Sequence, residues 1–73
     1  QNADSYDAEI AAMDMDRASV KLHLPRHIYK IEWYNPRSGE WTVDEELPKI
    51  GGGYERELTC PFAGDAVLIL TRE

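Results

Sequence analysis

The chain has 73 residues, a formal net charge of −6 and a pI near 4.8, and 42% of its residues are hydrophobic. This composition excludes wholesale disorder, and the length allows a single domain, residues 1–73, which buries only about 60% of the surface of its unfolded chain. The eight Lys and Arg residues are scattered, and no apolar run approaches the ~20 residues of a membrane span. We therefore expect neither nucleic acid nor a membrane as a partner.

The N-terminal stretch 8–16 has a mixed pattern. Its alanines and Met13 favour a helix by propensity. Asp14 and Asp16 are unfavourable near the C-terminal end of a helix, because the helix dipole disfavours acidic groups there. We predict a strand at about residues 8–14, with a helix as the alternative.

Alternation of apolar and polar side chains, the pattern of a half-buried strand, recurs through the rest of the chain. It predicts strands at residues 20–24, 29–34, 40–43 and 54–60. Residues 66–70 are apolar at every position, which is typical of a central strand covered on both faces. Together these elements, about six strands, predict an all-β fold: a small antiparallel β-sandwich or a Greek-key barrel.

Charged residues, glycines and prolines indicate where the predicted strands are connected. The acidic run 44–46 is interpreted as a solvated loop rather than a calcium or partner site. The triple glycine at 51–53 is interpreted as a flexible connection, since no helix follows it as a phosphate-binding loop requires. We predict a turn at residues 61–64.

The segment Trp33–Trp41 carries the clearest local signal in the chain. Pro36 has the φ that a type I turn needs at its second position, Asn35 can accept hydrogen bonds from the following amides, and Gly39 can take a positive φ. Strand-favouring residues flank these turn residues on both sides. The segment therefore predicts a β-hairpin closed by this turn motif.

The register of the hairpin decides which aromatic side chains face solvent. A four-residue loop places Tyr34 opposite Trp41 and puts Trp33 on the other face. A loop one residue longer or shorter pairs Trp33 with Trp41 instead. In the first register, Tyr34 and Trp41 form a candidate exposed pair.

Aromatic side chains are the candidate binding groups of this sequence. Tyr34, Trp41 and Tyr54 combine flat apolar faces with a polar group, which suits stacking on sugar rings or packing on a partner protein. We expect Trp33 to be a core residue. The other three are candidate ligand-binding residues, with interface packing as the alternative.

The residue pattern indicates no catalytic constellation, cofactor or metal site. Cys60 lies in an apolar strand without an evident base, so we expect a structural thiol rather than a nucleophile. His23 and His27 are separated by a proline, which excludes helical i, i+4 metal-binding geometry. Asp14 and Asp16 are candidates for the carboxylate pair of a glycoside hydrolase, but we predict a turn or solvated edge there.

One family resemblance covers most of the chain, from about residue 20 to residue 70. It is carried by a Val-x-Leu-x-Leu strand, by the hairpin residues Trp-Tyr-Asn-Pro-Arg-Ser-Gly-Glu, and by Pro-Phe-Ala-Gly-Asp-Ala-Val-Leu near the C-terminus. In this order the motifs resemble the small C-terminal β domain, labelled a collagen-binding domain, of apiosidase-like glycoside hydrolases. That domain follows a (β/α)₈ catalytic domain, and its members often carry Trp where this chain has Ala66.

The resemblance implies a non-catalytic accessory domain that packs in cis on the catalytic barrel of a bacterial glycoside hydrolase. The alternative is a module that binds carbohydrate, or another polymer, through its exposed aromatic residues. A polysaccharide-acting parent favours a secreted or periplasmic location. Because the chain begins with Gln1 rather than Met, we expect a processed or excised piece of a longer protein.

Overall fold

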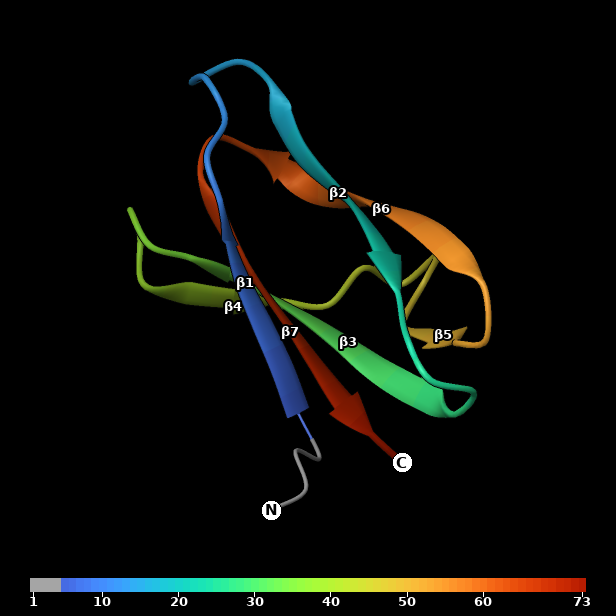
Figure 1. The fold of residues 1–73 in the computed structure, drawn as a ribbon. Coiled ribbons are helices and arrows are strands. Elements are labelled where there is room, and N and C mark those ends of the chain that lie inside the picture. The colour runs from blue at the N-terminus through green and yellow to red at the C-terminus, as the bar shows by residue number, and fades with distance from the viewer. Residues whose placement is uncertain (1–4) are drawn as a thin grey trace.

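The computed structural model describes residues 5–73, which form an all-β domain of antiparallel strands without a helix (Figure 1). The expected fold class is confirmed, with seven strands where the sequence pattern indicated about six. They are β1 Ser5–Ile10, β2 Arg17–His23, β3 Ile28–Asn35, β4 Glu40–Thr42, β5 Lys49–Gly51, β6 Glu55–Ala63 and β7 Ala66–Arg72.

The strands form two sheets, and the arrangement is sandwich-like. The larger sheet has the order β1-β7-β3-β4, and β5 pairs with the other end of β3. The smaller sheet consists of β2 and β6. β7 is central, as expected, but it is not covered on both faces: Val67 and Ile69 on its outer face are only half-buried.

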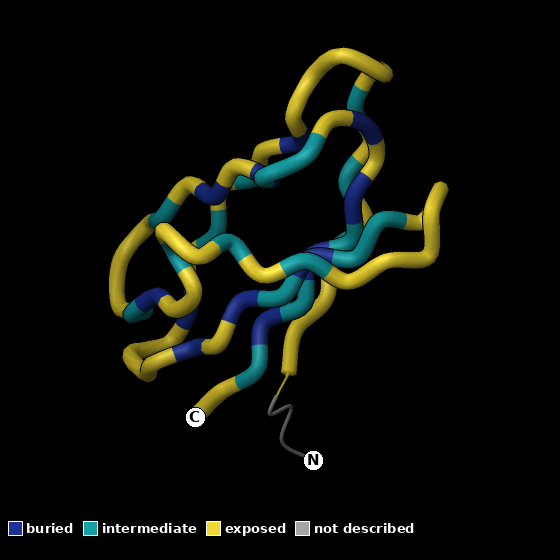
Figure 2. Tube along the Cα trace, turned by 180° about the vertical axis from the view of Figure 1, so that it is seen from behind, coloured by how far each residue is buried: buried dark blue, intermediate teal, exposed yellow. Residues whose placement is uncertain are grey.

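The core lies between the two sheets, and Figure 2 shows its buried positions along the strands and largely exposed turns. Trp33 is 2% exposed, so its prediction as a core residue is confirmed. The hydroxyl of the buried Tyr29 donates a hydrogen bond to the Pro25 carbonyl oxygen at 3.0 Å, which satisfies its one polar group. The other buried hydrophobic residues are Ala18, Leu24, Ile31, Ile50, Leu58, Cys60, Ala66, Leu68 and Leu70.

β1 resolves the ambiguity of the N-terminal stretch in favour of a strand, although the strand begins earlier than expected and ends at Ile10. Residues 11–16 form a loop that ends in a turn, with the Asp16 N–H donating to the Met13 carbonyl at 3.0 Å. Asp65 accepts a hydrogen bond from the Ala12 N–H at 2.9 Å. The turn expected at Asp14 and Asp16 is therefore confirmed.

The triple glycine, expected to be a flexible connection, is partly strand and is held by backbone hydrogen bonds. Gly51 ends β5, a strand that the alternation pattern misses because it spans only three residues. The Gly52 N–H donates to the His27 carbonyl and the Gly53 N–H to the Leu24 carbonyl, both at 2.8 Å. A Cβ at position 52 would lie 1.9 Å from the Pro25 carbonyl oxygen, so close backbone contact demands glycine there.

The turn expected at residues 61–64 begins later than predicted, because β6 continues through Pro61 to Ala63. β6 bulges here: its register shifts between the pairs Ser19↔Thr59 and Arg17↔Ala63. Pro61 has no N–H to donate, and a bulge is one of the few places in a sheet that tolerates it. The chain then turns at Gly64, whose φ is 93°.

The acidic run 44–46 forms the solvated loop that was expected. Its Glu45 and Glu46 are exposed. Asp44 organises the turn, since its Oδ1 accepts a hydrogen bond from the Glu46 N–H and its carbonyl accepts one from the Leu47 N–H, both at 3.0 Å.

Candidate functional site

The β3–β4 hairpin adopts the four-residue loop, which pairs Tyr34 with Trp41 and Trp33 with Thr42. The alternative register, with Trp33 opposite Trp41, is therefore wrong. The turn residues act as the sequence indicated. Asn35 Oδ1 accepts hydrogen bonds from the backbone N–H groups of residues 37 and 38, and Gly39 has a φ of 75° while its N–H donates to the Asn35 carbonyl at 2.7 Å.

This register builds an apolar row on the outer face of the larger sheet, the face turned away from the core. Tyr34 is paired with Val67 on one side and Trp41 on the other, and directly paired residues share a face. Ile69, two residues along β7 from Val67, lies on the same face. We call Tyr34, Trp41, Val67 and Ile69 the outer patch. Trp41 is its most exposed member, at 58%.

Acidic side chains border the outer patch. Glu9 pairs with Val67, and Asp7 and Glu32 both pair with Ile69, so all three carboxylates share the outer face. Lys30 and Lys49 lie on this face farther along β3 and β5. The patch is thus apolar at its centre and bordered by negative charge, from Asp7 and Glu9 on β1 and from Glu32 on β3.

A shallow hollow of about 430 Å³ adjoins the outer patch. Its lining includes Val67 of the outer patch and Glu9 of the acidic border. It extends to Pro36 of the hairpin turn and Asp65 of the β6–β7 turn. An aromatic pair beside a hollow that holds two carboxylates offers stacking and hydrogen-bond acceptors at one place.

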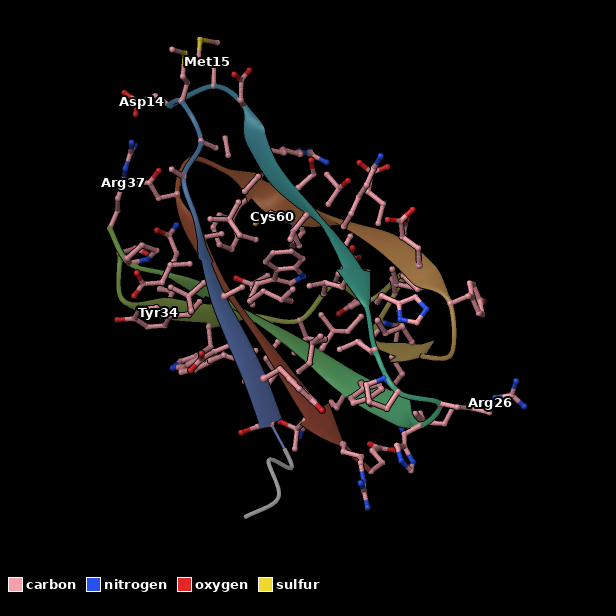
Figure 3. The ribbon with its side chains drawn as sticks, viewed as in Figure 1. Asp14, Met15, Arg26, Tyr34, Arg37 and Cys60 are labelled. Atoms are coloured by element: carbon pink, nitrogen blue, oxygen red, sulfur yellow. The ribbon has the colours of Figure 1, made fainter. Side chains whose placement is uncertain are left out.

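Tyr54 does not join the other two candidate aromatic residues. It is 59% exposed and directly precedes β6, at the end of the molecule where Gly53 packs against Arg26. Figure 3 places Arg26 at the opposite side of the molecule from Tyr34. The hydroxyl of Tyr54 accepts a hydrogen bond from Arg56 Nη1 at 2.8 Å, and the Arg56 guanidinium lies 5.2 Å from the ring centroid.

An ion pair that the sequence pattern did not indicate joins two loops near the hollow. Arg37, at the hairpin tip, donates a hydrogen bond to Asp14 in the β1–β2 loop, and Figure 3 shows the two side chains pointing toward each other. This hydrogen bond and the Asp14 charge raise the pKa of Arg37. The partners are 23 positions apart, so only the fold brings them together.

The thiol of Cys60 lies in the core, where Figure 3 shows it between the sheets. It is fully buried, and burial raises its pKa, so the structural role expected for it is supported by its surroundings. Across residues 5–73, no group of three or more His, Cys, Asp or Glu side chains is placed to hold a metal ion. The same residues contain no helix that could cross a membrane.

The ring centroids of Tyr34 and Trp41 are 5.0 Å apart and their planes are inclined by 55°, so the two rings form a tilted pair rather than a flat platform. No family model, curated protein or solved structure matches this chain. The outer patch, its acidic border and the adjoining hollow are the features on which a function can be argued.

Proposed function

We propose that this chain is a non-catalytic accessory β domain that packs, through its outer patch, on the catalytic domain of a glycoside hydrolase. The observation that carries the proposal is the half-exposed apolar row Val67–Tyr34–Trp41 on the outer face of the larger sheet. Contiguous exposed apolar residues with a polar rim are typical of surfaces that contact another protein. The glycoside hydrolase itself is supported only by the family resemblance of the hairpin and C-terminal motifs.

Physical considerations favour a packed partner. A domain of 73 residues buries a modest share of its surface, and its two-stranded sheet covers the inner face of a larger one. Interfaces between domains of one chain are more polar than obligate interfaces. The acidic border of Asp7, Glu9 and Glu32 fits a partner surface that is apolar at its centre and basic beside it.

The proposal is tested by the reactivity of Trp41 toward N-bromosuccinimide, which modifies accessible tryptophan. In the isolated chain, Trp41 reacts and the buried Trp33 does not. In a protein that joins this chain to the catalytic domain that the proposal requires, Trp41 is expected to be protected, as peptide mass mapping would report. Tyr54 serves as an internal control, because it lies far from the patch and stays accessible to tyrosine-selective iodination in both proteins. Equal reactivity of Trp41 in the two proteins would overturn the proposal.

Carbohydrate binding by the same surface is the second candidate function. It is favoured by the position of Trp41 and Tyr34 beside a hollow that contains the carboxylates of Glu9 and Asp65. Aromatic faces stack on sugar rings, and carboxylates accept hydrogen bonds from sugar hydroxyl groups. The acidic border disfavours anionic polysaccharides and leaves neutral ones as ligands.

Titration of the isolated chain with neutral polysaccharides, followed by tryptophan fluorescence, tests this second function. Trp33 is buried and gives a constant background, so a saturable change reports on Trp41. Trp41→Ala removes the response, whereas Tyr54→Ala, which alters an equally exposed aromatic residue elsewhere, leaves it unchanged. Flat traces across a broad panel of polysaccharides, with the wild-type chain folded, would exclude carbohydrate binding.

A further inference from the structure

The sulfur atoms of this chain are divided between two opposite environments. The sequence contains two methionines and one cysteine. Met13 and Met15 are 77% and 92% exposed in the β1–β2 loop, whereas Cys60 is fully buried. Figure 3 shows Met15 at the tip of this loop, pointing away from the body of the molecule, with Cys60 in the interior.

The packing of the core does not account for two methionines at these exposed positions. Methionine normally fills gaps in cores, and neither side chain belongs to the core cluster here. Their loop is held by other groups: the Ala12 N–H donates to Asp65, the Gly64 N–H donates to the Asp16 carbonyl at 2.8 Å, and Arg37 pairs with Asp14. The thioethers are therefore free to change chemically without loss of these anchors.

We propose that Met13 and Met15 form the oxidation site of this chain for peroxides and hypohalous acids, while the core thiol stays reduced. Each thioether attacks the terminal oxygen of a peroxide or the halogen of a hypohalous acid. With a peroxide, an S–O bond forms, the O–O bond breaks, and the hydroxyl proton transfers to the leaving oxygen, which departs as water or alcohol. With a hypohalous acid, the sulfur instead takes the halogen as hydroxide leaves; water then adds to the halosulfonium sulfur, halide departs with the S–halogen electrons, and the two protons of that water go to hydroxide and to solvent. Sulfur is oxidised by two electrons to a sulfoxide, and the oxidant is reduced by two electrons.

The environment of Cys60 explains why it is spared. Oxidants react with the thiolate rather than the thiol, and the reaction requires access to the sulfur. Burial denies that access, and the same burial raises the pKa of the thiol and so lowers its thiolate fraction. Sulfoxide formation at the loop tip adds polar groups where water already surrounds the side chains, so the fold is expected to persist.

Exposure also makes the modification reversible. Methionine sulfoxide reductases return the sulfoxide to the thioether, one enzyme class for each epimer. A sulfoxide on a protruding turn is accessible to such an enzyme, whereas one in a core is not. The turn at residues 13–16 thus has the features of a site that can consume oxidant and be repaired.

The test is oxidation of the purified chain with hydrogen peroxide, with free methionine as the rate standard. Intact mass is expected to increase by one and then two oxygen atoms, both mapped to the peptide with residues 13–16, at rates close to that of free methionine. In both the untreated and the oxidised chain, Cys60 is expected to react with iodoacetamide only when the chain is unfolded in urea. The tryptophan fluorescence and near-UV circular dichroism of the folded chain are unchanged.

The double variant Met13→Leu/Met15→Leu is the matched control, because leucine is similar in size, cannot be oxidised and replaces side chains outside the core. It is expected to fold and to take up no oxygen under the same conditions. Oxidation of Cys60 before the methionines, or loss of the fold after two oxygen atoms have been added, would overturn the proposal. So would methionine oxidation much slower than that of the free amino acid.

Discussion

Trp41 on β4 lies directly opposite Tyr34 on β3, with their ring centroids 5.0 Å apart on the outer face of the sheet. The other tryptophan of the hairpin, Trp33, is one position from Tyr34 and is buried on the opposite face. One hairpin thus places its two tryptophans in opposite environments, because neighbouring side chains of a strand point to opposite faces.

Because the two tryptophans lie in opposite environments, we expect replacing them to lower the free energy of unfolding by unequal amounts. Trp33→Ala leaves a large cavity among Ile31, Leu68 and the smaller sheet, and we expect it to lower the free energy of unfolding by about 3–5 kcal/mol. Trp41→Ala removes only a cross-strand contact, and we expect a loss of about 1 kcal/mol or less. Urea denaturation followed by far-UV circular dichroism measures both. Similar losses for the two variants would contradict the assignment of faces.

Two neighbouring glycines are expected to differ sharply in their tolerance of a methyl group. At Gly52 a Cβ would lie 1.9 Å from the Pro25 carbonyl oxygen, so Gly52→Ala must displace backbone, and we expect a loss of about 1–3 kcal/mol or more. At Gly51 the nearest atom is Ile28 Cδ1 at 3.8 Å, an ordinary contact. Gly51→Ala is therefore the matched control, and its unfolding free energy should change by about 0.5 kcal/mol or less. Equal denaturation midpoints for the two variants would contradict this packing.

Alkaline conditions are expected to destabilise the fold. Burial raises the pKa of Cys60, and burial followed by the proximity of Tyr6 raises that of Tyr29. A pKa raised on folding contributes stability that is complete below the pKa of the unfolded chain and is lost as pH rises through the folded value. Stability should therefore fall from about pH 8.5, where free thiols titrate, through about pH 10 and above, where phenols do.

Urea midpoints measured from pH 7 upward follow this loss. Cys60→Ala lowers stability at neutral pH through its cavity but removes the thiol contribution to the alkaline slope. Tyr29→Phe removes the phenol contribution and the hydrogen bond to Pro25. An alkaline slope that neither variant reduces would show that other groups cause it.

The Arg37–Asp14 ion pair is expected to couple the hairpin tip to the β1–β2 loop in a salt-dependent way. Both side chains are more than half exposed, so water and ions screen their attraction. A double-mutant cycle with Arg37→Ala and Asp14→Ala should give a small favourable coupling energy at low salt that disappears at about 1 M salt, where the Debye length is about 3 Å. A coupling that persists at high salt would indicate a contact other than the ion pair.

Local sequence signals predicted the parts of the fold that depend on neighbouring residues. The hairpin turn required Asn35 and Gly39, and alternation placed Trp33 in the core, because both depend on a few adjacent positions. β5 was missed, since its three residues acquire strand geometry only through pairing with β3. The sequence pattern predicts a turn from Pro61, whereas the structure continues β6 through it, because the bulge that tolerates a proline there depends on pairing with the distant β2.

The candidate site divides in the same way. Tyr34, Trp41 and Tyr54 were all recognisable as binding candidates from their chemistry, and the outer-face location of the first two followed from one of the two registers considered. The strand order β1-β7-β3-β4 decides which residues surround these candidates. It places Val67, Ile69 and Glu9 beside Tyr34 and Trp41, and it leaves Tyr54 apart from them.

By itself, then, the sequence determined the all-β class, the hairpin turn and the burial of Trp33, because turn dihedrals and side-chain alternation are set by neighbouring residues. The tertiary structure alone decided which surfaces exist. The outer patch, the Arg37–Asp14 ion pair and the contrast between the exposed methionines and the buried Cys60 arise where segments distant in sequence meet. The pairing of such segments reflects the burial of one shared core, which no local pattern encodes.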